Sequence, residues 1–138
     1  MTRYLGLDYG NVRLGVAISD ESGRFARPHG VILHSGWGPT ARAVARLMQE
    51  LQAASVVMGL PYTMEGELGE QAQEVLGFTE VLKNLGVAVI LQDERLSSFE
   101  AQERLRERGK SIAEMKTLVD QEAAAIILQT WLDENRVH

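Results

Sequence analysis

Apolar and polar residues alternate near the start of the chain. Every second residue from Val12 to Ile18 is apolar, and this period of two predicts a strand with one buried face. A short apolar strand over residues 3–8 precedes it across the turn at Gly10-Asn11, and residues 30–34 form a third apolar segment. The first third of the chain is therefore predicted to be a three-stranded antiparallel meander.

The remaining two thirds alternate between helical and uninterrupted apolar segments. Apolar residues at helical spacing, together with capping and breaking residues, predict helices over residues 40–53, 67–84, 97–108 and 118–135. Residues 55–61 and 87–91 are apolar without alternation, which is typical of parallel strands covered on both faces. Residues 109–116 are polar and are predicted to form a mobile loop.

These elements predict one α/β domain spanning residues 1–138. Right-handed crossovers place the two later strands beside the first, which gives a five-stranded mixed sheet in the order 3-2-1-4-5 with helices on both faces. In such a sheet a functional site is expected where the central strands end and the strand order changes direction. Asp8, residues 59–61 and the pair Asp93-Glu94 are the segments that end there.

The composition excludes several functions. The chain of 138 residues contains no cysteine, so it has no disulfide, thiolate metal site or cysteine nucleophile. It shows neither a leader segment nor an apolar run of membrane-spanning length, and we expect a cytoplasmic protein without membrane association. The net charge of -5 disfavours indiscriminate binding of nucleic acid, yet residues 1–46 hold six arginines against three acids. This first third either faces a polyanion or carries scattered, solvated arginines.

Three acidic positions stand where the local pattern favours apolar residues. Asp8 ends a buried strand, where it either caps the following turn or takes part in a site, and Asp93-Glu94 follows the last strand. Asp120 lies within the apolar stripe of the last predicted helix, which is formed by Ala123, Ala124, Ile127, Leu128 and Trp131. An unpaired carboxylate there is unfavourable by several kcal/mol, so Asp120 requires a cation, hydrogen bonds or an N-cap role, for which Thr117 competes.

The acids can converge on one metal site. Neighbouring strands are about 4.8 Å apart, so the first and fifth strands flank the fourth at about 10 Å, and Gly59 leaves the space between them open. Carboxylates without nearby histidine or cysteine favour Mg²⁺ or Mn²⁺, and a pair of such ions activates water for phosphodiester hydrolysis. Adjacent residues of a strand point to opposite faces, so only one of these two acids can be a direct ligand. We favour Glu94, with Asp93 as a supporting or structural residue. Arg95 either forms a surface ion pair or contacts a substrate phosphate.

The histidines and tryptophans carry no comparable signal. The spacing of His29, His34 and His138 fits neither a metal site nor a catalytic pair, and we interpret them as surface or loop residues. Trp37 and Trp131 are too isolated to form a base-stacking platform, and Trp131 is expected in the core.

Five segments of the chain resemble the YqgF/RuvX family of small bacterial proteins. They are, in chain order, LGLDYGNVRLG (5–15), ARP (26–28), GLPYTMEG (59–66), DERLSS (93–98) and VDQEAAAIIL (119–128). The resemblance implies a single RNase H-like nuclease domain that acts as a Holliday junction resolvase or processes the 5′ end of pre-16S ribosomal RNA. It puts Asp8, an acid of the Asp93-Glu94 pair and Asp120 at the family's catalytic positions.

We therefore predict a nuclease that depends on Mg²⁺ or Mn²⁺ and has a two-metal site. The predicted catalytic residues and metal ligands are Asp8, Glu94 and Asp120, with Asp93 as a further candidate ligand. The predicted contacts to the substrate, an RNA precursor or branched or single-stranded DNA, are Arg13, Arg27, Arg95 and Lys116. Association with the ribosome and formation of a homodimer are compatible with this prediction.

Two other functions remain open. Residues 7–11 (LDYGN) also resemble the first phosphate loop of sugar kinases and actin-like ATPases, which implies an ATP-binding or phosphoryl-transfer domain. Those enzymes place the nucleotide between two such domains, and this chain has the length of one. If all the acids prove to be caps, a non-catalytic module that binds RNA or the ribosome is favoured.

Overall fold

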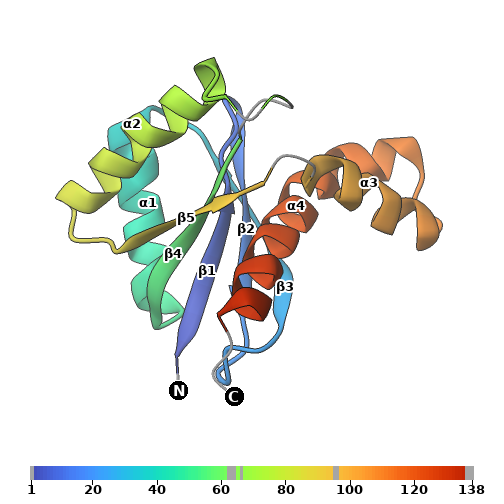
Figure 1. Ribbon diagram of the computed structural model, residues 1–138, viewed down its shortest axis with the longest axis horizontal. Helices are drawn as coiled ribbons and strands as arrows, with labels where there is room; N and C mark the ends of the chain where they lie inside the picture. Colours follow the sequence, from blue (N-terminus) through green and yellow to red (C-terminus); the bar gives the residue numbers. More distant parts are fainter. Residues whose placement is uncertain (1, 62–64, 66, 95–96, 136–138) are drawn as a thin grey trace.

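A five-stranded mixed sheet forms the centre of the protein. The computed structural model describes residues 2–61, 65, 67–94 and 97–135 (Figure 1). The strands are β1 (Arg3–Asp8), β2 (Arg13–Ser19), β3 (Ala26–Leu33), β4 (Ala53–Leu60) and β5 (Val89–Asp93), in the order β3-β2-β1-β4-β5. β1 pairs antiparallel with β2 and β2 with β3, whereas β1–β4 and β4–β5 are parallel. The predicted strand order and the antiparallel meander are confirmed.

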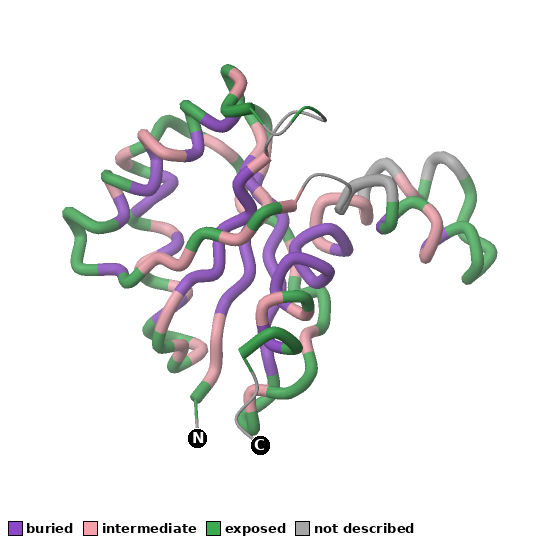
Figure 2. The backbone as a smooth tube through the Cα atoms, viewed as in Figure 1, coloured by how far each residue is buried: buried purple, intermediate pink, exposed green. Residues whose placement is uncertain are grey.

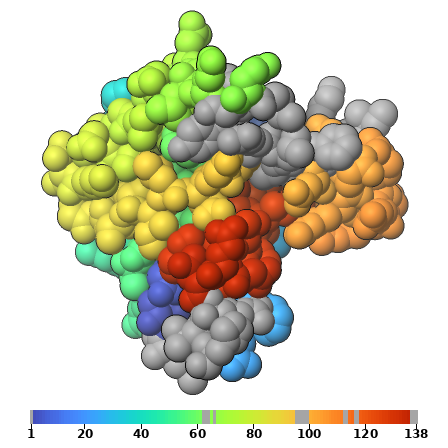
Figure 3. All heavy atoms as spheres, viewed as in Figure 1, coloured from blue at the N-terminus to red at the C-terminus, as the bar shows by residue number. Residues whose placement is uncertain are grey.

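Helices cover both faces of this sheet, as predicted. α1 (Trp37–Glu50) and α2 (Glu70–Asn84) lie on one face, and α4 (Ile112–Glu134) crosses the other (Figure 1). α3 (Ser97–Glu107) packs on α4 and projects at the edge of the molecule, as the orange atoms in Figure 3 show. The described part of the chain contains no helix with the length and apolar character needed to span a membrane.

The central strands of the sheet are largely buried (Figure 2), and apolar side chains pack on both faces of the sheet. On the α1 and α2 face, alternate strand residues such as Leu7, Val16 and Met58 pack against Val44 and Phe78. The α4 face is lined by smaller residues, and its core is formed by Ala17, Val57, Ala124, Ala125, Ile127, Leu128 and Leu132. β2 is therefore buried on both faces rather than one, because its residues toward α4 are small enough to lie beneath a helix.

Element boundaries differ from the sequence prediction in physically clear ways. α4 begins at Ile112, not at residue 118, so the mobile loop predicted over residues 109–116 is wrong. Ser111 caps the helix, its hydroxyl accepting from the Glu114 N–H while the Glu114 side chain accepts from the Ser111 N–H.

β3 begins at Ala26 rather than residue 30, since an edge strand tolerates Pro28. α1 begins at Trp37 rather than residue 40, since Pro39 needs no backbone donor in the first turn.

Candidate active site

Asp8 ends β1 on the face covered by α4. It pairs with Gly15 of β2, and it shares its face of the strand with Gly6, over which α4 lies closely. Burial raises the pKa of the Asp8 carboxyl well above its ordinary value, and the negative charges of Glu94 and Asp120 raise this pKa further. A capping role would lower the pKa, because backbone donors stabilise the charged form. Asp8 therefore lies in an acidic neighbourhood and does not behave as a turn cap.

Glu94 extends from the end of β5 across β4 toward that neighbourhood. A Cβ atom built at Gly59 would lie 2.5 Å from Glu94 Cγ and 2.6 Å from Ile127 Cδ1 of α4, so only glycine leaves room for the Glu94 side chain. The backbone N–H of Glu94 donates to the Leu60 carbonyl at 3.3 Å and continues the pairing of the two strands. The expectation that Gly59 leaves open the space between β1 and β5, the two strands that flank β4, is confirmed.

Asp93 faces the other way. It pairs with Leu60 and is exposed, while its neighbours Gln92 and Glu94 point toward α4. Gln92 donates to the Glu134 carboxylate of α4 at 3.4 Å, which shows that Gln92, and with it Glu94, lies on the α4 face of the sheet. Of the two adjacent acids, Glu94 is the one that the structure brings near Asp8.

Asp120 approaches the same point from α4. It lies well inside the helix, so the N-cap alternative and the competing Thr117 cap are wrong. A Cβ atom at Gly15 would lie 1.9 Å from the Asp120 carbonyl oxygen, which means that the helix backbone rests directly on β2 at this residue. Nε of Arg13 donates to Oδ2 of Asp120 at 2.5 Å, so a cation partner is present for this carboxylate.

The donor chemistry of the three acids fits a hard divalent ion, because all are carboxylates from separate elements. Within the residues that the structure describes, no three acidic or imidazole side chains are grouped as a metal site. The Asp120 carboxylate is instead directed at Arg13. The arrangement therefore brings the predicted acids together without forming a complete coordination shell.

The predicted substrate contacts do not all gather at this point. Arg13 lies at the acids. Arg27 is exposed on β3, where its register with Ile18 puts it toward the opposite end of the sheet. Arg95 and the side chain of Lys116 lie outside the described residues.

The turn after Asp8 is held by an aromatic network that the sequence did not reveal. Tyr9 is 4% exposed, and its hydroxyl oxygen lies 2.9 Å from Nε2 of His34 and 2.9 Å from Nε1 of Trp37. The N–H of Gly36 donates to Nδ1 of His34 at 3.2 Å, so Nε2 carries the proton and donates to Tyr9. His34 lies in the loop that follows β3, in line with its interpretation as a surface or loop residue, but the sequence did not indicate that His34 and Trp37 both bond to Tyr9. These partners are far apart in sequence, and no local pattern connects them.

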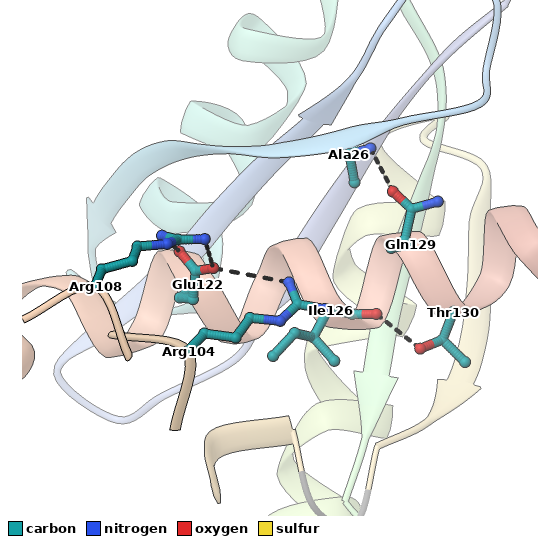
Figure 4. A network of polar contacts seen from close by, with 7 residues as sticks. All are labelled: Ala26, Arg104, Arg108, Glu122, Ile126, Gln129 and Thr130. Atoms are coloured by element: carbon teal, nitrogen blue, oxygen red, sulfur yellow. Dashed lines mark hydrogen bonds and ion pairs between the residues drawn. The ribbon is translucent and has the colours of Figure 1, made fainter. Parts of the chain in front are cut away.

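A buried ion pair fixes α3 on α4 near Asp120. Glu122 is 3% exposed and accepts hydrogen bonds from Arg108 at 3.0 and 3.2 Å, while Nη1 of Arg104 lies 3.7 Å from the same carboxylate (Figure 4). On the same helix, Gln129 accepts from the backbone N–H of Ala26 at 2.8 Å, which ties α4 to the edge strand β3 (Figure 4). These contacts hold the helix that carries Asp120 in place.

Solved structures identify this architecture as the RNase H-like fold of RuvC-type nucleases. Thermus thermophilus RuvC, solved with a Holliday junction substrate, matches with a TM-score of 0.58 at 16% sequence identity, over 97% of this chain and 96% of the other. The fowlpox virus resolvase, solved with substrate Holliday junction DNA, matches with a TM-score of 0.58 at 12% identity, over 96% and 98% of the two chains. Likeness at these identities defines the fold.

The chain belongs to the RuvX family, described as Holliday junction resolvase, which matches residues 2–134. A relative from Anaeromyxobacter sp. (strain Fw109-5), named as a candidate pre-16S rRNA nuclease, is 46% identical over 132 residues, 95% of this chain and 96% of the relative. A relative of the same name from Synechococcus elongatus is 41% identical over 133 residues, 96% of this chain and 89% of the relative. The family resemblance of the sequence motifs is confirmed.

Proposed function

We propose that this protein is a nuclease that hydrolyses phosphodiester bonds with Mg²⁺ or Mn²⁺ held by Asp8, Glu94 and Asp120. Membership of the RuvX family supports nuclease chemistry. The single observation that carries the metal dependence is the pKa of Asp8, which is raised by burial and by the charges of Glu94 and Asp120. The charges of Glu94 and Asp120 disfavour the ionised form of Asp8, and a divalent cation would relieve that repulsion.

Each residue has a distinct part in this proposal. Bound divalent ions would activate a water molecule and stabilise the charge that develops on the phosphodiester oxygens. Asp8 stands on the central strand β1, and Gly59 of β4 lets Glu94 reach toward it from the end of the edge strand β5. Asp93 is exposed on the opposite face, so we propose a structural rather than a ligand role for it. Arg13 is the described arginine best situated to contact a substrate phosphate, and we keep Arg27, Arg95 and Lys116 as more distant contacts to the nucleic acid.

We propose structured nucleic acid as the substrate, with precursor 16S rRNA first. The relatives named as candidate pre-16S rRNA nucleases, which match over most of their length, support an RNA precursor, and the family description supports a four-way DNA junction. Processing of a ribosomal precursor would take place in the cytoplasm and would bring the protein to the ribosome. Sedimentation with ribosomal particles tests that association, and sedimentation of the protein alone tests a homodimer.

A cleavage assay with matched acid variants tests the activity. Wild type, Asp8→Asn, Glu94→Gln and Asp120→Asn are incubated with a 5′-extended 16S rRNA fragment, a four-way DNA junction and single-stranded DNA, with Mn²⁺, Mg²⁺ or EDTA. Each variant is expected to lose at least about 100-fold in rate, because even outer-shell partners of a metal site contribute about 10- to 100-fold. Asp93→Asn is the matched control, and it is expected to cleave at close to the wild-type rate. Folded acid variants that cleave as fast as wild type would refute the proposal.

The two alternative functions make different predictions. Family membership does not favour a phosphoryl-transfer domain, and such a domain would gain thermal stability from ATP with Mg²⁺. A non-catalytic module would bind RNA equally well with EDTA and after Asp8→Asn. Cleavage that requires a divalent ion and all three acids is expected only of the nuclease.

A further inference from the structure

Arg13 is held against Asp120 by the packing of strand on helix. Arg13 and Gly15 lie on the same face of β2, and the absence of a side chain at Gly15 lets the α4 backbone rest on the strand at Asp120. The guanidinium therefore meets the Asp120 carboxylate, with Nε 2.5 Å from Oδ2. The two side chains are 39% and 27% exposed, so solvent screens the pair only in part.

Because of this contact, the Arg13 guanidinium and a divalent ion would both bind the Asp120 carboxylate. An oxygen of Asp120 that accepts a hydrogen bond from Arg13 is not fully available to coordinate a divalent ion. Among the described residues the acids are not grouped as a metal site, and the direction of Asp120 toward Arg13 is consistent with that arrangement.

We propose that Arg13 competes with the divalent ion for Asp120, and that binding of the ion transfers Asp120 from the guanidinium to the metal. Arg13 thereby acts as a positioning residue that lowers the metal affinity of the protein. Once released from Asp120, the guanidinium can pair with a phosphate of the substrate, since a bidentate fork suits phosphate as well as carboxylate. This inference rests on the proposed metal-dependent nuclease.

Direct metal binding tests the competition without any substrate. Mn²⁺ binding to the full chain is measured by calorimetry for wild type and Arg13→Gln, with Arg46→Gln as the matched control. Arg46 is an exposed arginine of α1, on the opposite face of the sheet, so its replacement removes the same charge far from the acids. Arg13→Gln is expected to bind Mn²⁺ about 5-fold more tightly than wild type, which corresponds to ~1 kcal/mol, and Arg46→Gln is expected to equal wild type.

A double-mutant cycle separates competition from simple charge repulsion. If Arg13 acts through Asp120, Arg13→Gln has no effect on Mn²⁺ affinity in an Asp120→Asn background. If its charge merely repels the ion, the increase in affinity persists in that background and the inference is overturned. Arg13→Lys serves if Arg13→Gln does not fold: it keeps the charge but loses the planar fork, and a modest gain in Mn²⁺ affinity is expected.

The outcomes distinguish this inference from the proposed function. Wild-type binding of Mn²⁺ with no change in Arg13→Gln overturns the inference and leaves the metal-dependent nuclease standing. Binding that is found only in Arg13→Gln supports the competition in its strongest form. If neither protein binds Mn²⁺, the metal-dependent function fails and the inference fails with it. A second readout is the thermal midpoint, which Mn²⁺ is expected to raise more in Arg13→Gln than in wild type.

Discussion

Folding makes it harder to ionise the Asp8 carboxyl, because burial and the charges of Glu94 and Asp120 raise its pKa above the value in the unfolded chain. The free energy of unfolding therefore falls as the pH rises above the pKa that Asp8 has in the unfolded chain. The fall is complete once the pH exceeds the pKa of Asp8 in the folded protein. Asp8→Asn removes this loss. In EDTA at pH 7 we expect the variant to be more stable than wild type, by about 1.4 kcal/mol for each unit of pKa shift. Urea unfolding at pH 7 and pH 4 measures the gain, which should nearly vanish at the lower pH.

The stability of the Asp120→Asn variant is the comparison for that of Asp8→Asn. It removes a negative charge from the same neighbourhood, but it also removes the partner of Arg13. We therefore expect no gain in stability from Asp120→Asn at pH 7, in contrast to Asp8→Asn. A loss of stability in Asp8→Asn would show that its carboxylate is satisfied by local donors, and would remove the main support for a metal at this place.

Candidate site residues could be predicted where the free-energy cost of the residue follows from its local sequence. An acid at a buried strand end or within an apolar stripe is unfavourable in any fold, and this reasoning selected Asp8 and Asp120. Strand alternation indicated that only one of Asp93 and Glu94 could face the other acids, and the structure has Glu94, the favoured one, on the side of α4. Arg13 was selected only as a phosphate contact, because its pairing with Asp120 joins residues 107 positions apart in the chain. No sequence period reports such a contact.

At the scale of elements, the approach of α4 to the sheet depends on Gly15. Its added Cβ would lie 1.9 Å from a backbone oxygen and 2.2 Å from the carbonyl carbon of Asp120, and backbone atoms cannot rotate away. Gly15→Ala is expected to destabilise the protein by about 3 kcal/mol or more, at the upper end of overpacking effects. Gly30→Ala on β3 is the control, since nothing lies within 4 Å of its Cβ position. Equal unfolding midpoints in urea for the two variants would contradict this account of the packing.

Elements were predicted well where hydrophobic period and length agreed, and their ends were predicted poorly. The order of the sheet followed from the change between alternating and continuous apolar strands. The start of α4 was missed because Ser111 and Glu114, which form its capping box, lie within residues 109–116, a stretch that was interpreted as a polar loop. Without that start, Asp120 was assigned an N-cap alternative that its actual position inside the helix removes.

At the scale of the whole molecule, the candidate site combines residues from β1, β2, α4 and the end of β5. The convergence of the strand ends could be predicted from topology. The depth at which α4 lies over them could not, because it depends on three glycines from three strands, Gly6, Gly15 and Gly59, meeting one helix. The sequence therefore predicted which acids meet, but not how closely or with which cation.

Two parts of the molecule differ in how firmly they are held. The sheet carries α1, α2 and α4 on its faces, whereas α3 packs on α4 and contacts little else among the described residues. Its apolar contact with α4 includes Ala101, which packs with Ala123 and Ile126, and Leu105 of α3 is also fully buried. The buried Glu122, with Arg104 and Arg108, adds an ion-pair network to this contact. α3 should open locally without unfolding the sheet.

Amide hydrogen exchange tests this division. In wild type, the amides of α3 are expected to exchange faster than those of β1 and β4. Glu122→Gln keeps the shape of the side chain and removes its charge, so it should speed exchange in α3 by about 10-fold, which corresponds to ~1.4 kcal/mol, with little change in the strands. Glu103→Gln is the matched control, because Glu103 pairs with Arg106 on the exposed side of the same helix. If Glu122→Gln instead speeds exchange equally in α3, β1 and β4, then α3 unfolds with the sheet as one cooperative unit, and the ion pair stabilises the molecule as a whole.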